Sequence, residues 1–219
     1  MRSEFVNKFN HDEDAPEYDQ DVRNEAHPIR AGYDALLDWV AAETAVAGSG
    51  QILELGSGTG NLTLRLTPGA AVTCVDVSQE MQLLAQEKLP AEREVTYVQE
   101  DILAFFDQPR EPFEAIVSTY TIHHLTEEEK ALLFEKIAAA LEPGGTAVFG
   151  DLMFKDDAAR EAYQAMCRAT GQEDLADDID DEFFWNVETA VEKLQTLGFE
   201  VRTKQFSALS WGIAARRPR

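Results

Sequence analysis

Basic residues, cysteine and long apolar runs are all scarce in this chain of 219 residues. It carries 19 Lys and Arg against 41 Asp and Glu, which gives a formal net charge of -22. A surface of that sign repels phosphate groups, so the composition argues against nucleic acid and anionic membranes as partners. The same charge would attract cationic ligands, but a solvated acidic surface tuned to solubility or to a salty cytoplasm is the simpler interpretation.

The two cysteines, Cys74 and Cys167, are far apart, and neither belongs to a C-x-x-C pair. We therefore expect neither a disulfide framework nor a bound metal. No apolar run approaches the roughly 18 residues of a membrane-spanning helix. The opening "MRSEFVNKFNHDED" lacks the apolar core of a signal peptide. These absences predict a cytoplasmic protein with two reduced thiols and no membrane segment.

Short apolar segments alternate with helical patterns through the middle of the chain. The strand-like runs occupy 51–55, 71–77, 94–98, 113–119 and 146–151. Helical patterns begin at the glycine-rich loop after the first run, at Ser78 and at Thr126, where hydroxyl side chains can cap them. This alternation predicts βαβ units in an α/β fold, with a doubly wound parallel sheet between helices. The final runs, 200–206 and 207–217, predict an antiparallel hairpin at a sheet edge.

The two ends of the chain depart from this alternation. Residues 1–47 contain helical patterns at 15–27 and 29–46 and no strand-like run, so we expect a helical arm packed on a domain of residues 48–219. The segment "DLADDIDDEFF", residues 174–184, is strongly acidic and is interpreted as a solvated connector between two helices. The alternative is that its charge favours a cationic acceptor.

The loop "ELGSGTGN" follows the first strand-like run. A glycine-rich loop at this place leaves backbone N–H groups free to bind a ligand at the carboxyl edge of the sheet. Gly56, Gly58 and Gly60 stand at every second position, unlike the G-x-G-x-x-G of dinucleotide sites, and no Lys follows as a phosphate loop requires. A tight turn without a ligand is the alternative interpretation.

Further residues stand at spacings that suit an adenosyl ligand. Asp76 ends the second strand about twenty residues after the loop, where a carboxylate can accept hydrogen bonds from both ribose hydroxyls. Met81, one turn into the next helix, can lie against an adenine ring. After the third strand, Asp101 can accept from an adenine amino group and the backbone N–H of Ile102 can donate to a ring nitrogen. Both aspartates could instead cap the helices that follow them.

The segments "LELGSGTG", "CVDVSQEM", "VQEDI", "FEAIVSTYTIHHL" and "LEPGGTAVF" resemble successive motifs of the class I S-adenosylmethionine-dependent methyltransferases. The resemblance covers residues 50–151, and the terminal hairpin agrees with it. The amino-terminal "FVNKFNHDEDAPEYDQDV", together with "GYDALL" and "GTGNLT", resembles a small-molecule branch of that family in Bacillus-type bacteria. The resemblance implies a Rossmann-like sheet of seven mostly parallel strands ending in the antiparallel hairpin. It also implies S-adenosylmethionine as the cofactor and a small-molecule methyl acceptor.

The predicted cofactor-binding set joins residues of the loop and the strand ends with two residues of the arm. The arm residues follow from the resemblance alone, which implies that Tyr18 closes over the methionine end of the cofactor and that Arg30 approaches its carboxylate. Ser118, at the end of the fourth strand, is placed near the methyl-bearing end. The whole set is Gly56, Ser57, Gly58, Gly60, Asp76, Val77, Met81, Asp101, Ile102, Ser118, Tyr18 and Arg30.

An adjacent pair of histidines, His123 and His124, lies just beyond the fourth strand. A pKa near 6.5 would let either one act as a general base, and the alternative is that both only pack or cap a helix. The sequence "STYT" stands where enzymes that methylate bases of nucleic acids carry Asn-Pro-Pro-Tyr or Asp-Pro-Pro-Tyr, which argues against such an acceptor. The aromatic residues Phe183, Phe184 and Trp185 either line an acceptor pocket or belong to the core.

Methyl transfer from S-adenosylmethionine to a small molecule is the function that the sequence favours. A second hypothesis is a module that binds S-adenosylmethionine or S-adenosylhomocysteine without turnover, because no catalytic base is assured. A third is a nicotinamide-dependent oxidoreductase, which the G-x-G-x-G spacing and the "EDI" at 100–102 disfavour. The acceptor atom (O, N, S or C) and the oligomeric state are left open.

Overall fold

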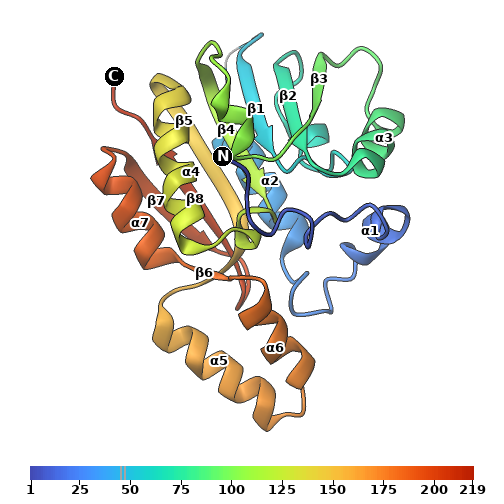
Figure 1. Ribbon diagram of the computed structural model, residues 1–219, viewed down its shortest axis with the longest axis vertical. Coiled ribbons are helices and arrows are strands. Elements are labelled where there is room, and N and C mark those ends of the chain that lie inside the picture. Colours follow the sequence, from blue (N-terminus) through green and yellow to red (C-terminus); the bar gives the residue numbers. More distant parts are fainter. Residues whose placement is uncertain (45, 47) are drawn as a thin grey trace.

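The computed structural model describes residues 1–44, 46 and 48–219, and its centre is a twisted sheet with helices on both sides (Figure 1). The strands are β1 (Gln51–Leu55), β2 (Ala71–Asp76), β3 (Val95–Gln99), β4 (Phe113–Thr119), β5 (Leu141–Phe154), β6 (Trp185–Asn186), β7 (Glu200–Gln205) and β8 (Ser210–Arg216). Their order is β3-β2-β1-β4-β5-β8-β7, with β6 paired to β5 off this path. The pairs among β1 to β5 are parallel, and β8 runs antiparallel to both of its neighbours. The predicted doubly wound, mostly parallel sheet and its carboxyl-terminal hairpin are confirmed.

The helices fill the connections between the strands. They are α1 (Ala15–Asp21), α2 (Tyr33–Glu43), α3 (Gln79–Lys88), α4 (Glu127–Ala140), α5 (Asp157–Ala169), α6 (Glu173–Asp181) and α7 (Val187–Thr196). Two of them begin at the predicted hydroxyl caps. The Ser78 side chain accepts a hydrogen bond from the Met81 N–H at 3.0 Å, and Thr126 forms a reciprocal capping box with Glu129.

Each face of the sheet has its own apolar core, because successive side chains of a strand point to opposite faces. In β1, Leu53 packs in the core that α4 and α7 cover, together with residues such as Leu133 and Leu194. Its neighbour Ile52 packs in the opposite core with Leu36 of α2. Figure 1 shows α4 and α7 in front of the sheet and α2 behind it. Helices α5 and α6 pair with each other beyond the end of the sheet.

The prediction of a helix after the glycine-rich loop is wrong, because only a 3-10 turn forms there, at Thr63–Arg65. The polar side chains of this stretch bond to other elements. The Thr63 hydroxyl donates to Glu54 at 2.7 Å, and the Asn61 amide donates to Asp19 at 3.0 Å. Leu62 and Leu66 are buried in the core beside α2, so the segment is held in an irregular form by tertiary contacts.

The prediction of an acidic connector at 174–184 is also wrong, because most of this segment belongs to helix α6. Leu175, Ala176 and Ile179 lie on one side of this helix and are buried. That apolar stripe anchors α6 against α5, while the carboxylates remain on its other faces. The acidic composition concealed a short amphipathic helix.

The helices of the first 47 residues are shorter than expected. Helix α1 ends at Asp21 and α2 begins at Tyr33, after Gly32 in a left-handed conformation. Residue 45, just before the end of the predicted helix 29–46, and residue 47, the last of the predicted arm, lie outside the described residues. The division into an arm of residues 1–47 and a domain of residues 48–219 therefore stays a prediction. Within the described ranges, no helix has the length and apolarity needed to cross a bilayer.

Candidate active site

A cavity of about 480 Å³ opens at the carboxyl ends of β1, β2 and β4. Strand order reverses between β1 and β4, which is where open α/β sheets bind their ligands. The glycine-rich loop after β1 forms one side of the cavity, and residues that follow β2, β3 and β4 form others. Residues before α2, among them Ser3, Phe9 and Tyr18, close the remaining side.

The three glycines of the loop have different roles. All three have positive φ, which disfavours other residues there. At Gly56, a Cβ would lie 2.0 Å from the Thr121 hydroxyl, so the loop and the end of β4 approach too closely for a side chain. At Gly58, a Cβ would meet no atom within 4 Å, and this residue lines the cavity. Gly60 instead packs on α3, where a Cβ would lie 3.3 Å from Ala85.

Asp76 lies at the end of β2 and faces the loop. Its two carboxyl oxygens accept hydrogen bonds from the backbone N–H of Gly58 at 2.7 Å and of Ser78 at 2.9 Å. Burial raises the pKa of this carboxyl, and the two backbone hydrogen bonds oppose that shift. Each oxygen retains a lone pair, so the side chain can also accept from ligand hydroxyls in the cavity that it lines.

Met81, Asp101 and Ile102 form the part of the cavity beyond Asp76. Asp101 does cap the turn that follows it, since one oxygen accepts from the N–H groups of Leu103 and Ala104 at 3.0 and 2.9 Å. Its other oxygen accepts from the Ser3 N–H at 3.3 Å. No hydrogen bond from the Ile102 N–H occurs within the described residues, so this donor is available to a ligand.

A network around Asp19 joins α1 to the glycine-rich loop. The Asp19 carboxylate accepts from the Thr59 hydroxyl at 2.6 Å and from the Asn61 amide at 3.0 Å, and Lys88 of α3 lies 2.5 Å away. Burial alone would raise the pKa of Asp19, but hydrogen bonds from Lys88 and Thr59 outweigh it and lower the pKa. The network holds the neighbouring Tyr18 on the cavity wall.

Arg30 reaches the same wall from the segment before α2. Its guanidinium lies 5.8 Å from the centre of the Tyr18 ring and is paired with Asp21 at 2.9 Å. Both residues that the resemblance placed at the methionine end of the cofactor therefore line the cavity together. The positive charge of Arg30 is matched by the Asp21 carboxylate.

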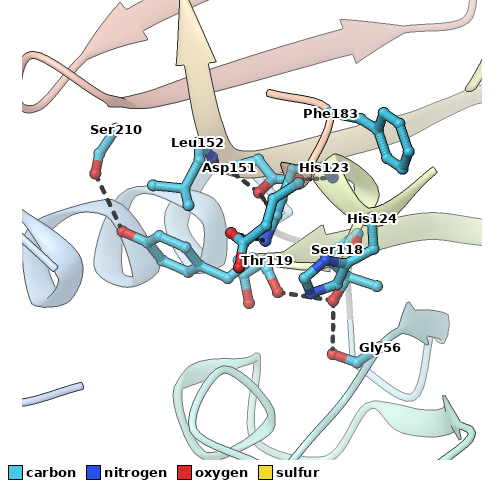
Figure 2. A network of polar contacts seen from close by, with 12 residues as sticks. Gly56, Ser118, Thr119, His123, His124, Asp151, Leu152, Phe183 and Ser210 are labelled. Carbon is cyan, nitrogen blue, oxygen red and sulfur yellow. Dashed lines mark hydrogen bonds and ion pairs between the residues drawn. The ribbon is translucent and has the colours of Figure 1, made fainter. Parts of the chain in front are cut away.

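His123 is held by a buried carboxylate that sequence reasoning missed. Asp151 of β5 is 1% exposed and accepts from the His123 ring Nδ1 at 2.5 Å and from the His123 backbone N–H at 3.1 Å (Figure 2). Because a carboxylate only accepts, Nδ1 carries a proton, and in the neutral ring Nε2 then presents its lone pair. His123 lines the cavity, and its Nε2 lies 3.9 Å from the carboxylate of Glu182.

His124 lies in a different environment from its neighbour. Its ring stacks on Phe9 with centroids 4.1 Å apart, and its Nε2 lies 3.4 Å from the Nε2 of His11. Burial lowers the pKa of His124 well below its ordinary value, and the charges of His123 and His11 lower it further. A lowered pKa makes this ring a weaker base, and its stacking on Phe9 packs the amino-terminal segment onto the cavity that His124 also lines.

Not every residue of the predicted set lies on the cavity. Ser57, Val77 and the other loop and strand-end residues do, whereas Gly60 and Ser118 do not. The buried Ser118 hydroxyl donates to the Leu55 carbonyl at 2.8 Å and so links β4 to β1. Phe184 and Trp185 are buried in the two cores, which supports the core interpretation of these aromatic residues.

The residues that sequence reasoning missed carried weak signals. Asp151 follows a glycine at the end of a strand-like run, a place where polar residues gather at the sheet edge. Glu182 lies in the acidic segment 174–184, whose composition indicates a solvated connector, and Asp19 lies among several other carboxylates of the amino-terminal segment. Among the described residues, no group of three His, Cys, Asp or Glu side chains is arranged to hold a metal ion.

The chain has clear relatives among known proteins. Residues 52–145 match the family model of the methyltransferase domain. An uncharacterized methyltransferase from Geobacillus thermodenitrificans is 37% identical over 221 residues, with 98% of each chain covered. Another, from Oceanobacillus iheyensis, is 32% identical over 218 residues, with 99% of each chain covered.

This chain belongs to the class I S-adenosylmethionine-dependent methyltransferases. The fold of this methyltransferase is similar to that of magnesium protoporphyrin IX methyltransferase from Synechocystis PCC 6803, solved with S-adenosylhomocysteine bound. The TM-score is 0.68 at 19% identity, and 97% of each chain is covered. The predicted family is confirmed, and the cofactor is S-adenosylmethionine.

The residues on the cavity of this methyltransferase fit that cofactor. The Ser57 hydroxyl is buried without a hydrogen-bond partner, and Gly58 leaves open space beside it. Asp76 offers carboxylate oxygens at the end of β2, and Tyr18 and Arg30 line the same cavity. A positively charged sulfonium is also favoured by the excess of carboxylates around the cavity.

Proposed function

We propose that this methyltransferase transfers the methyl group of S-adenosylmethionine to a small-molecule acceptor, with His123 as the general base. The observation that carries the proposal is one cavity shared by Asp76, at the adenosyl end, and by the buried His123–Asp151 pair. A base held in place beside the proposed cofactor-binding residues supports transfer with proton removal over binding alone.

The proposed cofactor-binding set is the part of the predicted set that lines the cavity. It comprises Gly56, Ser57, Gly58, Asp76, Val77, Met81, Asp101, Ile102, Tyr18 and Arg30. Gly60 and Ser118 are left out, because their contacts lie within the protein. The Asp76 carboxylate would accept from the ribose hydroxyls, and the Ile102 N–H would donate to the adenine ring.

Bound S-adenosylmethionine supplies an electrophilic methyl group on a sulfonium. The protein contributes position and proton removal, and orientation alone can lower a barrier by roughly 7–11 kcal/mol. Asp151 keeps the proton on Nδ1 of His123, so that Nε2 can take a proton from the acceptor. The same carboxylate stabilises the imidazolium that results. General-base catalysis of this kind contributes about 10²–10⁴-fold in rate.

Calorimetry with S-adenosylmethionine, S-adenosylhomocysteine and NAD tests the cofactor site directly. We expect the first two to bind and NAD not to bind, and NAD binding alone would favour the oxidoreductase hypothesis. Release of S-adenosylhomocysteine is then followed across a panel of small O, N and S acceptors. Tight cofactor binding without transfer to any acceptor would favour the non-catalytic binding module.

A further inference from the structure

The cavity carries more negative charge than the cofactor can neutralise. Among the described residues that line it are seven carboxylates and a single guanidinium, that of Arg30, with no Lys. Arg30 itself is paired with Asp21 at 2.9 Å. S-adenosylmethionine adds only a single net positive charge, so the occupied cavity still attracts cations and repels anions.

One of these carboxylates, Glu182, stands beside the proposed base. Its side chain is 32% exposed, and its Oε2 lies 3.9 Å from Nε2 of His123. The chain is held there by the next residue, Phe183, which has a φ of +48° and whose carbonyl accepts from the buried Lys130 ammonium at 2.6 Å. Glu182 also terminates α6, and a helix carboxyl terminus carries a partial negative charge that favours cations.

His123 supplies a second, independent indication of a ligand at this point. The residue is 4% exposed and lines the cavity, and its Nδ1 is occupied by Asp151. In the part of the chain that the structure describes, its Nε2 makes no hydrogen bond. Although most of the residue is buried, this nitrogen is open to the cavity, so a ligand group that enters the cavity can become its partner.

Building on the methyl transfer proposed above, we propose that the acceptor is a small organic amine, which arrives as an ammonium ion and is bound by Glu182 and His123. Two acceptor atoms 3.9 Å apart can both lie about 2.9 Å from one nitrogen, so a single ammonium group can donate to both. Glu182 provides the charge that selects the cation, and His123 provides the lone pair that takes its proton.

The transfer step balances with these groups alone. The ammonium gives one proton to Nε2 of His123, and the nitrogen lone pair then forms the bond to the methyl carbon. The bond between that carbon and sulfur breaks, and its electron pair stays on sulfur. The products are the N-methylated ammonium ion, S-adenosylhomocysteine and one proton, which leaves His123 for the solvent.

The surroundings of Glu182 indicate an apolar body on the amine. The rings of Phe5 and Phe9 line the cavity, and Phe5 also packs on Phe183 with centroids 5.0 Å apart. Phe9 stacks on His124, next to the proposed base. An amine with an aryl or branched alkyl group would place that group on these rings while its nitrogen meets Glu182 and His123.

The test uses probes that share one apolar body and differ in the charge and chemistry of the head group. The probes are 2-phenylethylamine, 2-phenylethanol and 3-phenylpropanoate, with a matched set on an alkyl body. Binding of each probe to the protein loaded with S-adenosylhomocysteine is measured by calorimetry and ligand-observed NMR. Turnover is measured separately as release of S-adenosylhomocysteine from S-adenosylmethionine. We expect the amine to bind at least about tenfold more tightly than the alcohol, and the carboxylate to bind least.

Two variants locate the binding group. Glu182→Gln should weaken amine binding about tenfold and leave alcohol binding and S-adenosylmethionine affinity within about threefold of wild type. Asp181→Asn is the matched control, because it removes the same charge at the preceding position. Asp181 is exposed and does not line the cavity. This control should leave amine binding unchanged, and circular dichroism checks that both variants fold.

The outcomes separate this inference from the proposed function. Preferred binding or methylation of the carboxylate or the alcohol would overturn the proposal that the acceptor is an amine. Failure of every amine to bind the loaded protein would overturn it as well. Equal effects of Glu182→Gln and Asp181→Asn would remove Glu182 from the site. Failure of the wild-type protein to bind S-adenosylmethionine would instead overturn the cofactor site on which both proposals rest.

Discussion

His123 and His124 are adjacent in the chain, yet their surroundings give them different chemistry. His123 has a carboxylate on one ring nitrogen and the cavity on the other, whereas His124 is stacked under Phe9. Their order in the sequence could not distinguish them. The partner that does so, Asp151, is 28 residues away and belongs to the neighbouring strand.

Replacing His123 tests this assignment. With an acceptor in hand, His123→Ala should lower kcat by about 10²-fold or more, because proton removal is lost, while S-adenosylmethionine affinity stays near that of wild type. His27→Ala, at an exposed position outside the cavity, is the control. Calorimetry and initial rates measure the two effects separately. Normal turnover of the His123 variant would show that His123 is not the general base and only packs against its neighbours.

Glu54 gives the stability of the protein a dependence on pH. It is 1% exposed at the end of β1, and burial raises its pKa from 4.5 to about 7, although hydrogen bonds from Thr63 and Cys74 oppose the shift. The folded state therefore holds a proton that the unfolded state loses above pH 4.5. Its stabilising effect is fully present below pH 4.5 and is lost as pH rises through 7, a change of about 3 kcal/mol.

Glu54→Gln should remove this contribution. Urea unfolding of both proteins at a series of pH values between 4.5 and 8 measures the difference in unfolding free energy. We expect the variant to gain up to about 3 kcal/mol relative to wild type as pH rises across that range, because glutamine stays neutral. A difference that does not change with pH would mean that Glu54 is not protonated in the folded state.

At the scale of elements, α1 is held on the site by polar contacts more than by apolar burial. Only Ala15 of this seven-residue helix is buried, and a helix so short is not stable alone. The Asp19 network with Thr59, Asn61 and Lys88 joins it to the glycine-rich loop and to α3. The helix can therefore loosen without loss of the sheet, which would allow the cofactor to enter and leave.

Asp19→Ala should loosen α1 selectively. We expect a loss of about 1–2 kcal/mol of unfolding free energy, faster hydrogen exchange of residues 15–32 and faster dissociation of S-adenosylmethionine. Asp38→Ala is a suitable control, because it removes the ion pair between the exposed Asp38 of α2 and Arg65. Exchange followed by mass spectrometry and stopped-flow release of the cofactor measure the effect. Unchanged exchange in residues 15–32 would show that the network does not restrain the helix.

At the scale of the whole molecule, a net charge of -22 acts against the compact state by self-repulsion. Raising NaCl from 0.1 to 1 M shortens the screening length from about 10 to about 3 Å. The melting temperature should therefore rise by several degrees, since 1 kcal/mol corresponds to about 2–4 °C at this size. The salt effect should shrink as pH approaches the pI of about 4.4. A melting temperature that salt leaves unchanged or lowers at pH 7 would contradict this expectation.

The sequence by itself determined the sheet, the glycine-rich loop and the grouping of the residues proposed to bind the adenosyl part of the cofactor. These features depend on short-range spacing. Strands show as apolar runs, and parallel strands place their carboxyl ends along one edge, so Gly58, Asp76 and Asp101 could be brought together without coordinates. Helix α6 was missed because three apolar residues lay among many carboxylates.

Only the tertiary structure decided which histidine is bonded to a buried carboxylate and which charges surround it. Asp151 meets His123 because β5 lies beside β4, and Glu182 meets it because α6 ends against the same cavity. Asp19 reaches the glycine-rich loop through the fold of the amino-terminal segment. Such contacts join residues distant in the chain, and no local period or spacing encodes them. They arise when burial of the two cores sets the strand order and brings the chain ends over the site.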